Sequence, residues 1–589
     1  MEQSTSDRKL LSSLFFRLLP YQILLIVINA VNGIVDSLYA SNAIGQAAMS
    51  AIGLYGPFNH FLYAASILLV SGSQILYGRY IIRERERIHS LFSVDLLISA
   101  VLSVLTSVLL ALGVVTGVTR LMVSVQPDLQ MFNQYILGQA IGIPALVLGQ
   151  QLFAFLSLEN QTKRTMVASI VCFTVNAVLN HLFVVIIPMG TFGLGLSSSI
   201  ASWVFFAVQA EYYLRGKSEW KFSIRSCRRH DGAEIALLGY PGAISRFLEM
   251  FRCFIVNNLI LKYVGSVGLS SFAASNSLLA VVWAVPFGMV AVARMLFSVS
   301  IAEEDRRSLV DTMHIVMTKG QVLMGVIVAL LILLAEPLTR LFYRVPADPV
   351  YHMTVMGFRL LPLCMPLAVL SLHFSAYTQT IQWKKLAVIL PIVDGMLGVV
   401  IFSFLLIPTL KMNGLYIANI LNGVLCFLVI FVAAWISLKR IPRNLEDLMA
   451  IPEGFGADET ERLDISVREL DQVVSISQQI IDFCLRRGID RRRAVFAGLC
   501  MEEMAGNVVL HGFTKDDKPH SIDIRVVHVE DGVILRIRDN CRMFNPSERA
   551  EIMEQGVGGK NAGIKLVYRI ASEINYQNLL GLNVLTIRI

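Results

Sequence analysis

Long apolar stretches alternate with short polar ones between residues 14 and 436 of the chain. Each apolar stretch reaches about 20 residues, the length that an α-helix needs to cross a bilayer. There are about twelve of them, with approximate cores at 18–39, 49–76, 93–117, 133–157, 166–188, 193–213, 235–261, 267–298, 316–340, 353–378, 386–408 and 414–437. The pattern predicts a polytopic α-helical membrane domain over residues 1–445.

The pattern changes after Lys439. An acidic linker with Gly and Pro residues covers 446–461. Four later segments alternate as strands (LDISV, SIDIRVVHV, VILRIRDN and LNVLTIRI), and DQVVSISQQIIDFCLRR has helical periodicity up to Gly488, a suitable C-cap. Further helices are expected over RRRAVFAGLCMEEMAGNVVLHGF and after a glycine-rich stretch. The order β-α-α-β-β-α-β predicts a cytoplasmic α/β sandwich over 462–589.

Composition supports this division. The chain is 55% hydrophobic and 16% charged, whereas about a quarter of the residues of a soluble protein are charged. The net charge of +7 comes from Lys and Arg between apolar segments and does not indicate a nucleic-acid partner. Eight cysteines without a CxxC pair suggest small buried side chains rather than a metal site or disulfides. The N-terminus lacks the features of a cleaved signal peptide.

The distribution of Lys and Arg predicts the orientation. One set of loops carries most of them, including the RERER cluster at 83–87. The opposite loops carry few, namely Arg120, Lys262, Arg340, Arg344 and Lys411. Cytoplasmic loops are enriched in positive charge. With an even number of spans, both termini are therefore expected in the cytoplasm.

The two halves of the membrane domain resemble each other at an offset of about 220 residues, giving repeats over about 10–220 and 230–440. The matching pairs are Pro20 and Pro241, Gly45 and Gly265, Pro144 and Pro366, and Lys163 and Lys385. Six spans per repeat give both halves the same orientation. Transporters with such repeats build a central cavity between two bundles.

Two segments in the first half carry a family resemblance. IVDSLYASNAIGQAAMSAIGLYGPF (34–58) resembles the first-helix signature of the multidrug and toxic compound extrusion (MATE) family. NAVLNHLFV (176–184) is similar to its fifth-span motif, with Asn180 in place of the motif's Asp. The resemblance implies a secondary transporter with alternating access that exports amphipathic compounds, driven by H⁺ or Na⁺.

Ionisable residues within apolar spans are candidates for transport, because intramembrane charge usually faces a cavity or a partner. Asp36 either couples ion movement to transport or forms hydrogen bonds at the membrane interface. Glu249 is three residues from both Arg246 and Arg252, on one helix face, so it belongs to a structural ion pair or to a cation-coupling site. Asn180, which stands where the family motif has Asp, is the third transport candidate.

Three further residues receive less weight. Asp394 and Arg359 are candidate cavity groups of the second half. His181, next to Asn180, is either a titrating group or a hydrogen-bonded packing histidine.

The C-terminal part contains three motifs in a fixed order. Glu503, Asn507 and His511 are spaced four apart along one helix stripe, where a carboxylate can activate a nucleophile and an amide oxygen can bind Mg²⁺. In RDNCRMFNP, Asp539 ends a strand with its carboxylate free to read an adenine amino group. GVGGKNAGIKLV (556–567) is a glycine-rich loop that runs into a helix, a combination that binds phosphates.

These motifs together resemble the boxes of the anti-sigma-factor serine kinases of the GHKL superfamily. The resemblance implies ATP and Mg²⁺ as cofactors, Glu503 as the general base, Asn507 as the Mg²⁺ ligand, Asp539 as the adenine contact, and a lid containing Gly558, Gly559 and Gly563. The sequence departs from the family at Cys541, where the family has Gly, and in the longer lid. The implied activity is serine/threonine kinase activity on an anti-sigma-antagonist-like protein, and whether this chain retains catalysis stays open.

Three functional hypotheses follow from these features. In the first, a transporter-like membrane domain in the lipid bilayer exports a small molecule in exchange for H⁺ or Na⁺ and carries an ATP-binding kinase-like domain. In the second, the membrane domain is a receptor that controls the kinase domain without transport. In the third, the ATP-binding domain gates transport. ATP-driven pumping is disfavoured, because the sequence contains no GxxxxGK[ST] motif.

Overall fold

The computed structural model describes residues 2–589 except 84–86, 124–127, 160, 217, 219, 224–226, 303–304, 382, 453–454, 456–461, 468–470, 513–521, 530–531, 540, 542–561 and 579–582. The contacts divide the chain into two compact units. We call residues 19–294 and 314–449 the helical unit, and residues 1–18, 295–313 and 450–589 the sheet unit.

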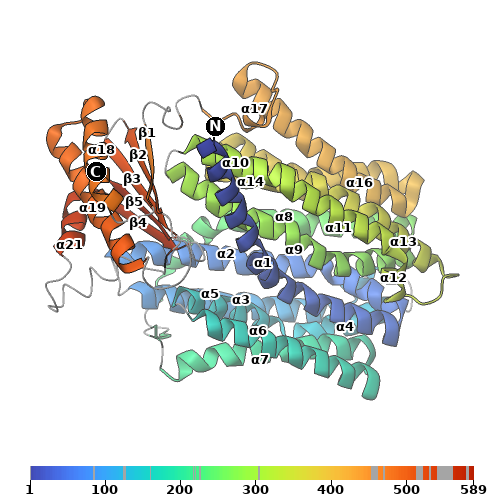
Figure 1. Cartoon of the computed structure of the whole chain (residues 1–589). Coiled ribbons are helices and arrows are strands. Elements are labelled where there is room, and N and C mark those ends of the chain that lie inside the picture. Colours follow the sequence, from blue (N-terminus) through green and yellow to red (C-terminus); the bar gives the residue numbers. More distant parts are fainter. Residues whose placement is uncertain are drawn as a thin grey trace. The chain divides into compact units, whose positions relative to one another are not determined.

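The first of the two sequence repeats consists of long apolar helices joined by short turns (Figure 1). They are α1 (Glu2–Tyr39), η1 (Ala40–Ile44), α2 (Gln46–Arg83), α3 (Arg87–Val115), η2 (Val118–Leu121), α4 (Asp128–Ala140), α5 (Ile143–Leu158), α6 (Thr162–Asn180), η3 (His181–Ile186) and α7 (Gly190–Leu214).

The second half repeats this arrangement. Its elements are α8 (Arg229–Tyr263), α9 (Ser266–Ala302), α10 (Arg306–Ile315), η5 (Val316–Gly320), α11 (Gln321–Leu333), α12 (Ala335–Arg340), α13 (Pro349–Leu360), η6 (Leu361–Cys364), α14 (Met365–Thr380), α15 (Lys384–Ile392), η7 (Val393–Leu397), α16 (Gly398–Leu438) and the short α17 (Leu445–Met449).

Within the described residues, eight helical segments are long and apolar enough to cross a membrane, or nine if the bent pair α4 and α5 forms one span. One of the eight, Lys384–Leu438, is kinked at Lys411 (φ 53°, ψ −131°) and covers two of the expected spans. α1 and α8 are not among them. The expected number of about twelve spans requires that α1 and α8 also cross the membrane. This stays a prediction.

The halves share local geometry at the residues that relate them in sequence. Gly45 (φ 123°) separates η1 from α2, and Gly265 (φ 89°) separates α8 from α9. Each amide donates to the carbonyl five residues earlier, at 2.8 Å to Ala40 and 3.0 Å to Ile260. Such φ values strongly favour glycine, which explains why glycine occurs at both positions.

The two halves contact each other closely along α2 and α8. A Cβ atom on Gly72 would lie 2.1 Å from the carbonyl oxygen of Ile235, and one on Gly239 would lie 1.7 Å from that of Leu68. Farther along the pair, Asn257 Nδ2 donates to the carbonyl of Gly53 at 2.9 Å. Glycine therefore allows the two backbones to meet directly.

The sheet unit contains five antiparallel strands in the order β1-β2-β3-β5-β4. They are β1 (Arg462–Val467), β2 (Ile522–Val529), β3 (Gly532–Asp539), β4 (Glu573–Asn578) and β5 (Asn583–Arg588), and α18 (Asp471–Arg486), α19 (Arg491–Gly512) and α21 (Ala562–Ile570) lie on one side of them (Figure 1). Alternate strand residues such as Ile524, Leu535 and Ile537 form a core with helix residues that include Ile480 and Met501. The three helices thus cover one face of the sheet.

The end of α18 agrees with the sequence prediction, whereas strand β4 differs from it. Gly488 has φ 77° and follows α18, as expected of a C-cap, and the amide of Ile489 donates to Cys484 at 3.1 Å. β4 was not expected, because Glu573–Asn578 contains few apolar residues.

Candidate functional site

A polar cluster in the helical unit surrounds Asp36, which lies one turn before the end of α1. Asn180 Nδ2 donates to Asp36 Oδ1 at 2.6 Å. Ser198 Oγ of α7 donates to Asp36 Oδ2 at 3.1 Å. Helices α1, α6 and α7 thus meet at one carboxylate.

The cluster continues behind these contacts. Asn180 Nδ2 also donates to Asn176 Oδ1 at 3.0 Å, and Asn176 Nδ2 donates to Ser198 Oγ at 3.2 Å. Ser197 Oγ donates to Asn180 Oδ1. The side chains of Asn176, Asn180 and Ser197 are completely buried. The network therefore fixes the orientation of Asn180 toward Asp36.

The cluster combines one carboxylate with amide and hydroxyl oxygens inside a membrane-spanning bundle. Hard cations prefer such oxygen ligands, and a carboxylate can alternatively take up a proton. A proton or cation on the Asp36 carboxylate would compete with the hydrogen bonds that it accepts from Asn180 and Ser198. Binding and release of a cation here would therefore be coupled to the packing of α1, α6 and α7.

His181 lies next to Asn180 but is directed elsewhere. Its Nδ1 is 3.4 Å from Tyr39 Oη, and the two rings pack edge to face. His181 begins the π-helical segment η3 directly after α6. It therefore contacts the end of α1 through Tyr39.

Glu249 of α8 lies at the contact with α2. Arg246 Nη1 is 2.7 Å from Glu249 Oε2, and His60 Nδ1 is 3.4 Å from the same atom. The Glu249 carboxylate thus has a permanently charged partner within the same helix. This arrangement favours the structural ion pair of the two interpretations that the sequence left open.

Asp394 is a hydrogen-bonded carboxylate in the second half of the helical unit. It lies in η7, the π-helical segment that follows α15, as η3 follows α6. Ser371 Oγ and Asn422 Nδ2 each donate to its carboxylate at 2.9 Å. Arg359 is not among these partners, because its Nη2 pairs with Glu336 Oε1 at 3.1 Å.

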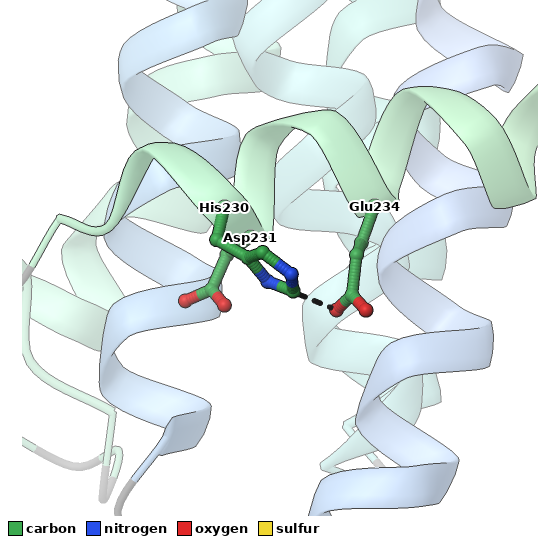
Figure 2. A group of neighbouring side chains, drawn as sticks. All are labelled: His230, Asp231 and Glu234. Carbon is green, nitrogen blue, oxygen red and sulfur yellow. Dashed lines mark ion pairs between the residues drawn. The ribbon is translucent and has the colours of Figure 1, made fainter.

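A further group of titratable side chains lies in the first turns of α8 (Figure 2). His230, Asp231 and Glu234 have ligand atoms within 4.8 Å of one another, and His230 Nδ1 is 3.8 Å from Glu234 Oε2. The buried Asp231 accepts a hydrogen bond from Ser90 Oγ at 2.6 Å. The Asp231 carboxylate therefore anchors the start of α8 to α3, and an acidic side chain is favourable in the first turn of a helix.

The model of the MatE family matches residues 22–182 and 241–405, which together are more than half of the chain. The chain belongs to the MatE family. The two matched segments fall in the two halves of the helical chain, and the first includes both Asp36 and Asn180. The predicted resemblance to MATE transporters is therefore confirmed, and the chain is a multi-pass membrane protein.

Individual relatives agree with the MatE assignment. The probable multidrug resistance proteins NorM of Aromatoleum aromaticum and Neisseria meningitidis serogroup B are each 25% identical, over 233 and 246 residues. Each alignment covers 38% of this chain and 50% of the relative, so the chain spans about half the length of these curated relatives.

Solved structures of MATE transporters share the fold. A multidrug resistance MATE family transporter of the MOP superfamily in an inward-facing conformation has a TM-score of 0.66 at 18% identity, covering 73% of this chain and 98% of that one. An outward-facing conformation of such a transporter has a TM-score of 0.58 at 18% identity, covering 71% and 94%.

The C-terminal candidate site lies outside the MatE match. Asp539 ends β3 and is directly paired with Asn583 of β5. Asn583 Nδ2 and the Cys541 amide donate to Asp539 Oδ1 at 2.7 and 3.0 Å, and Tyr576 Oη donates to Asn583 Oδ1 at 2.7 Å. Asp539, Cys541 and Asn583 are all buried. Their hydrogen bonds orient the carboxylate, and a carboxylate acceptor fits an exocyclic amino group of a purine.

The other residues predicted for this site are described only in part. Glu503 and Asn507 lie on one stripe of α19, with Glu503 exposed and Asn507 half-buried. His511 also lies in α19, but its side chain is outside the described residues, as are Gly558 and Gly559. Gly563 begins α21. Asn507 is an amide oxygen ligand of the kind that suits Mg²⁺.

The sequence indicates Asp36, Asn180 and Asp539 as candidates, but it does not indicate the serines and the asparagine that form hydrogen bonds with them. The serines at 197 and 198 occur in an SSS run that resembles ordinary small packing residues. Asn583 follows Gly and Leu at the start of a strand, without a motif of its own. Only the pairing of β3 with β5 shows that it contacts Asp539.

Proposed function

We propose that this MatE protein exports small amphipathic compounds in exchange for H⁺ or Na⁺, and that Asp36 is its coupling residue. The observation that carries the proposal is the contact of Asp36 with Asn180 and Ser198, which joins α1, α6 and α7 at one carboxylate. Occupation by a cation would compete with these hydrogen bonds and change how the three helices pack. The multidrug resistance names of the relatives support an amphipathic substrate.

Flux through proteoliposomes with an imposed pH or Na⁺ gradient tests this proposal. Asp36→Asn is expected to remove gradient-driven export of a fluorescent amphipathic compound, because the amide cannot exchange a charge. Asp95→Asn is the matched control, since Asp95 is also buried in the bundle but bonds to Ser73 instead. Equal gradient-driven flux in wild type and Asp36→Asn would contradict a coupling role for Asp36.

We propose further that residues 462–589 form a GHKL-type ATP-binding domain that regulates the transporter. The support is the orientation of Asp539 by Asn583 and Cys541 on the side of the sheet that packs against α19. In this proposal Asp539 binds the adenine amino group and Asn507 binds Mg²⁺, while Gly558, Gly559 and Gly563 cover the phosphates. Mg²⁺ would supply positive charge that offsets the charge of the phosphates.

Kinase activity is the more specific part of this proposal, with Glu503 as general base and an anti-sigma-antagonist-like protein as acceptor. Calorimetry of the full chain in detergent tests the binding step. Mg·ATP should bind to wild type, and Asn507→Ala should weaken this binding. Removal of Mg²⁺ should lower the affinity for ATP less in Asn507→Ala than in wild type. Glu503→Gln should preserve binding and lower phosphate transfer by roughly 10²–10⁴-fold. Absence of Mg·ATP binding to the folded protein would contradict the proposed cofactor.

A further inference from the structure

The sheet has a second face whose side chains are not part of the apolar core against the helices. Arg525 of β2 and Arg536 of β3 lie directly opposite each other on it, and Arg538 is two residues farther along β3. Arg525 and Arg536 are each only 5% exposed. Like charges at directly opposed positions destabilise a sheet, so this pair requires a buried anion.

Asp305, between α9 and α10, supplies that anion within the sheet unit. Its carboxylate forms ion pairs with Nη1 of Arg525 and, at 3.4 Å, with Nη1 of Arg536. The Asp305 residue is 3% exposed. One carboxylate thus bridges two strand arginines that are far from it in sequence.

Asp305 also determines where α10 begins. Its carboxylate accepts hydrogen bonds from the Ser308 amide at 3.0 Å and from Ser308 Oγ at 2.6 Å, which is an N-cap arrangement. The side chain that binds the sheet is therefore the same one that caps α10. A shift of the sheet that pulled on Asp305 would also disturb the first turn of this helix.

Apolar and backbone contacts surround the ion pair. Val299 of α9 and Val584 of β5 are both buried and form a cluster with Met295. Arg306 Nη1 donates to the carbonyl of Pro452 at 3.0 Å, in the stretch that leads to β1. The contact therefore combines charge complementarity with apolar burial, as stable docking surfaces do.

We infer that the second face of the sheet is a docking surface for this chain's own segment 295–313, and that the C-terminal domain restrains α9 and α10 through it. The regulatory part rests on the proposed transport function. α9 continues without a break from the helical unit into this segment. The restraint therefore reaches a helix within the second MatE segment through the backbone itself.

Cross-linking of the full chain in membranes tests the docking directly. Val299→Cys and Val584→Cys are combined, a protease site is introduced in the linker at 456–461, and oxidation is followed by cleavage. The two fragments should remain joined in the double variant and separate in either single variant, which controls for the native cysteines. Asp305→Asn should lower the joined fraction by roughly tenfold or more, because both buried arginines lose the carboxylate that ties them to segment 295–313.

Asp464→Asn is the matched control, because Asp464 also pairs with Arg525, at 2.6 Å from Nε, but belongs to the C-terminal domain itself. It should leave the joined fraction unchanged, and Asp305→Glu should retain much of it. Equal joining in wild type and folded Asp305→Asn would overturn the docking surface.

Flux tests the regulatory part. Asp305→Asn should increase the export rate several-fold over wild type, because α9 and α10 are released, whereas Asp464→Asn should not. An unchanged rate in Asp305→Asn, with cross-linking lost, would overturn the restraint but leave proposed transport intact. If wild type shows no flux, proposed transport fails and the restraint on transport fails with it, while the cross-link still decides the docking.

Discussion

At the scale of single residues, the most informative side chains are acids whose partners come from distant parts of the chain. Asp36 could be predicted as a candidate, because a carboxylate in an apolar span is unusual. Its partners in α7 could not, since serine in a helix has many uses. Asp305 could not be predicted either, because the sequence shows it only as one charge in the cluster AEEDRR. Its significance depends on the folded position of Arg525 and Arg536.

The hydrogen bond between Asn583 and Asp539 leads to a prediction for nucleotide binding. Asn583→Leu removes a donor to Asp539 Oδ1 and the oxygen that accepts from Tyr576 Oη. Affinity for Mg·ATP should fall by roughly tenfold, in line with the loss of one hydrogen bond to a charged group. Calorimetry measures this change. Asn575→Leu, at an exposed position of β4, is the control, and a similar loss there would point to general destabilisation of the sheet.

The ion pair of Asp305 predicts a pH dependence. Burial alone would raise the pKa of Asp305, but Arg525, Arg536 and Arg538 outweigh this effect and hold the pKa well below its usual range. The stabilisation from the ion pair is therefore present above the pKa of a free aspartate, about 3.9, and is lost as the pH falls toward the lowered value. The difference in unfolding temperature between wild type and Asp305→Asn should be constant from about pH 8 to 5 and shrink only below about 4. A difference that disappears near pH 6 would show that another group controls the contact.

At the scale of elements, turns with special backbone geometry were more predictable than short strands. Gly45, Gly265 and Gly488 lie at element ends and have positive φ. β4 was missed because its sequence, EINYQN, lacks apolar alternation and is held by its neighbour β5. The π-helical segments η3 and η7 also have no signal in the sequence. η3 directly follows Asn180 and η7 contains Asp394, so both occur at polar candidate residues, where such segments are frequent.

The glycine turns lead to a prediction for stability. Gly45→Ala introduces a side chain at φ 123°, although no neighbouring atom lies within 4 Å of the new Cβ. The cost is therefore backbone strain, on the order of 1–3 kcal/mol, and the unfolding temperature of the purified protein should fall by several degrees. Gly113→Ala is the control, because its surroundings are equally open but its φ is not positive. Equal unfolding temperatures for the two variants would contradict the strain argument.

At the scale of the whole molecule, the sequence was sufficient for the family, whereas the predicted domain over 462–589 stays a prediction. The first-helix and fifth-span motifs led to the MatE assignment because they are local and need no knowledge of tertiary contacts. The GHKL resemblance rests on three motifs, and much of the third lies outside the described residues, so it stays a proposal. The grouping of residues 295–313 with the C-terminal part could not be predicted, because no sequence boundary separates Arg294 from Met295.

The asymmetry of Lys and Arg predicts the orientation of the whole protein. Reporter domains fused after Arg229 and at Ile589 should both report the cytoplasm, since an even number of spans precedes each point. Activity of a reporter that functions only outside the cytoplasm, at either position, would contradict the predicted topology. A fusion after Lys262, in one of the loops with few basic residues, should give the opposite signal and serves as the control.

The docking of segment 295–313 on the sheet has a consequence for its affinity. Both partners belong to one polypeptide, connected through residues 314–449 and the stretch that precedes β1, so their association depends on an effective concentration within the chain and not on the protein concentration. A contact too weak to assemble two separate proteins would still be occupied most of the time. If the C-terminal domain were supplied as a separate chain, dilution would remove this advantage, and the same surface would then remain largely vacant.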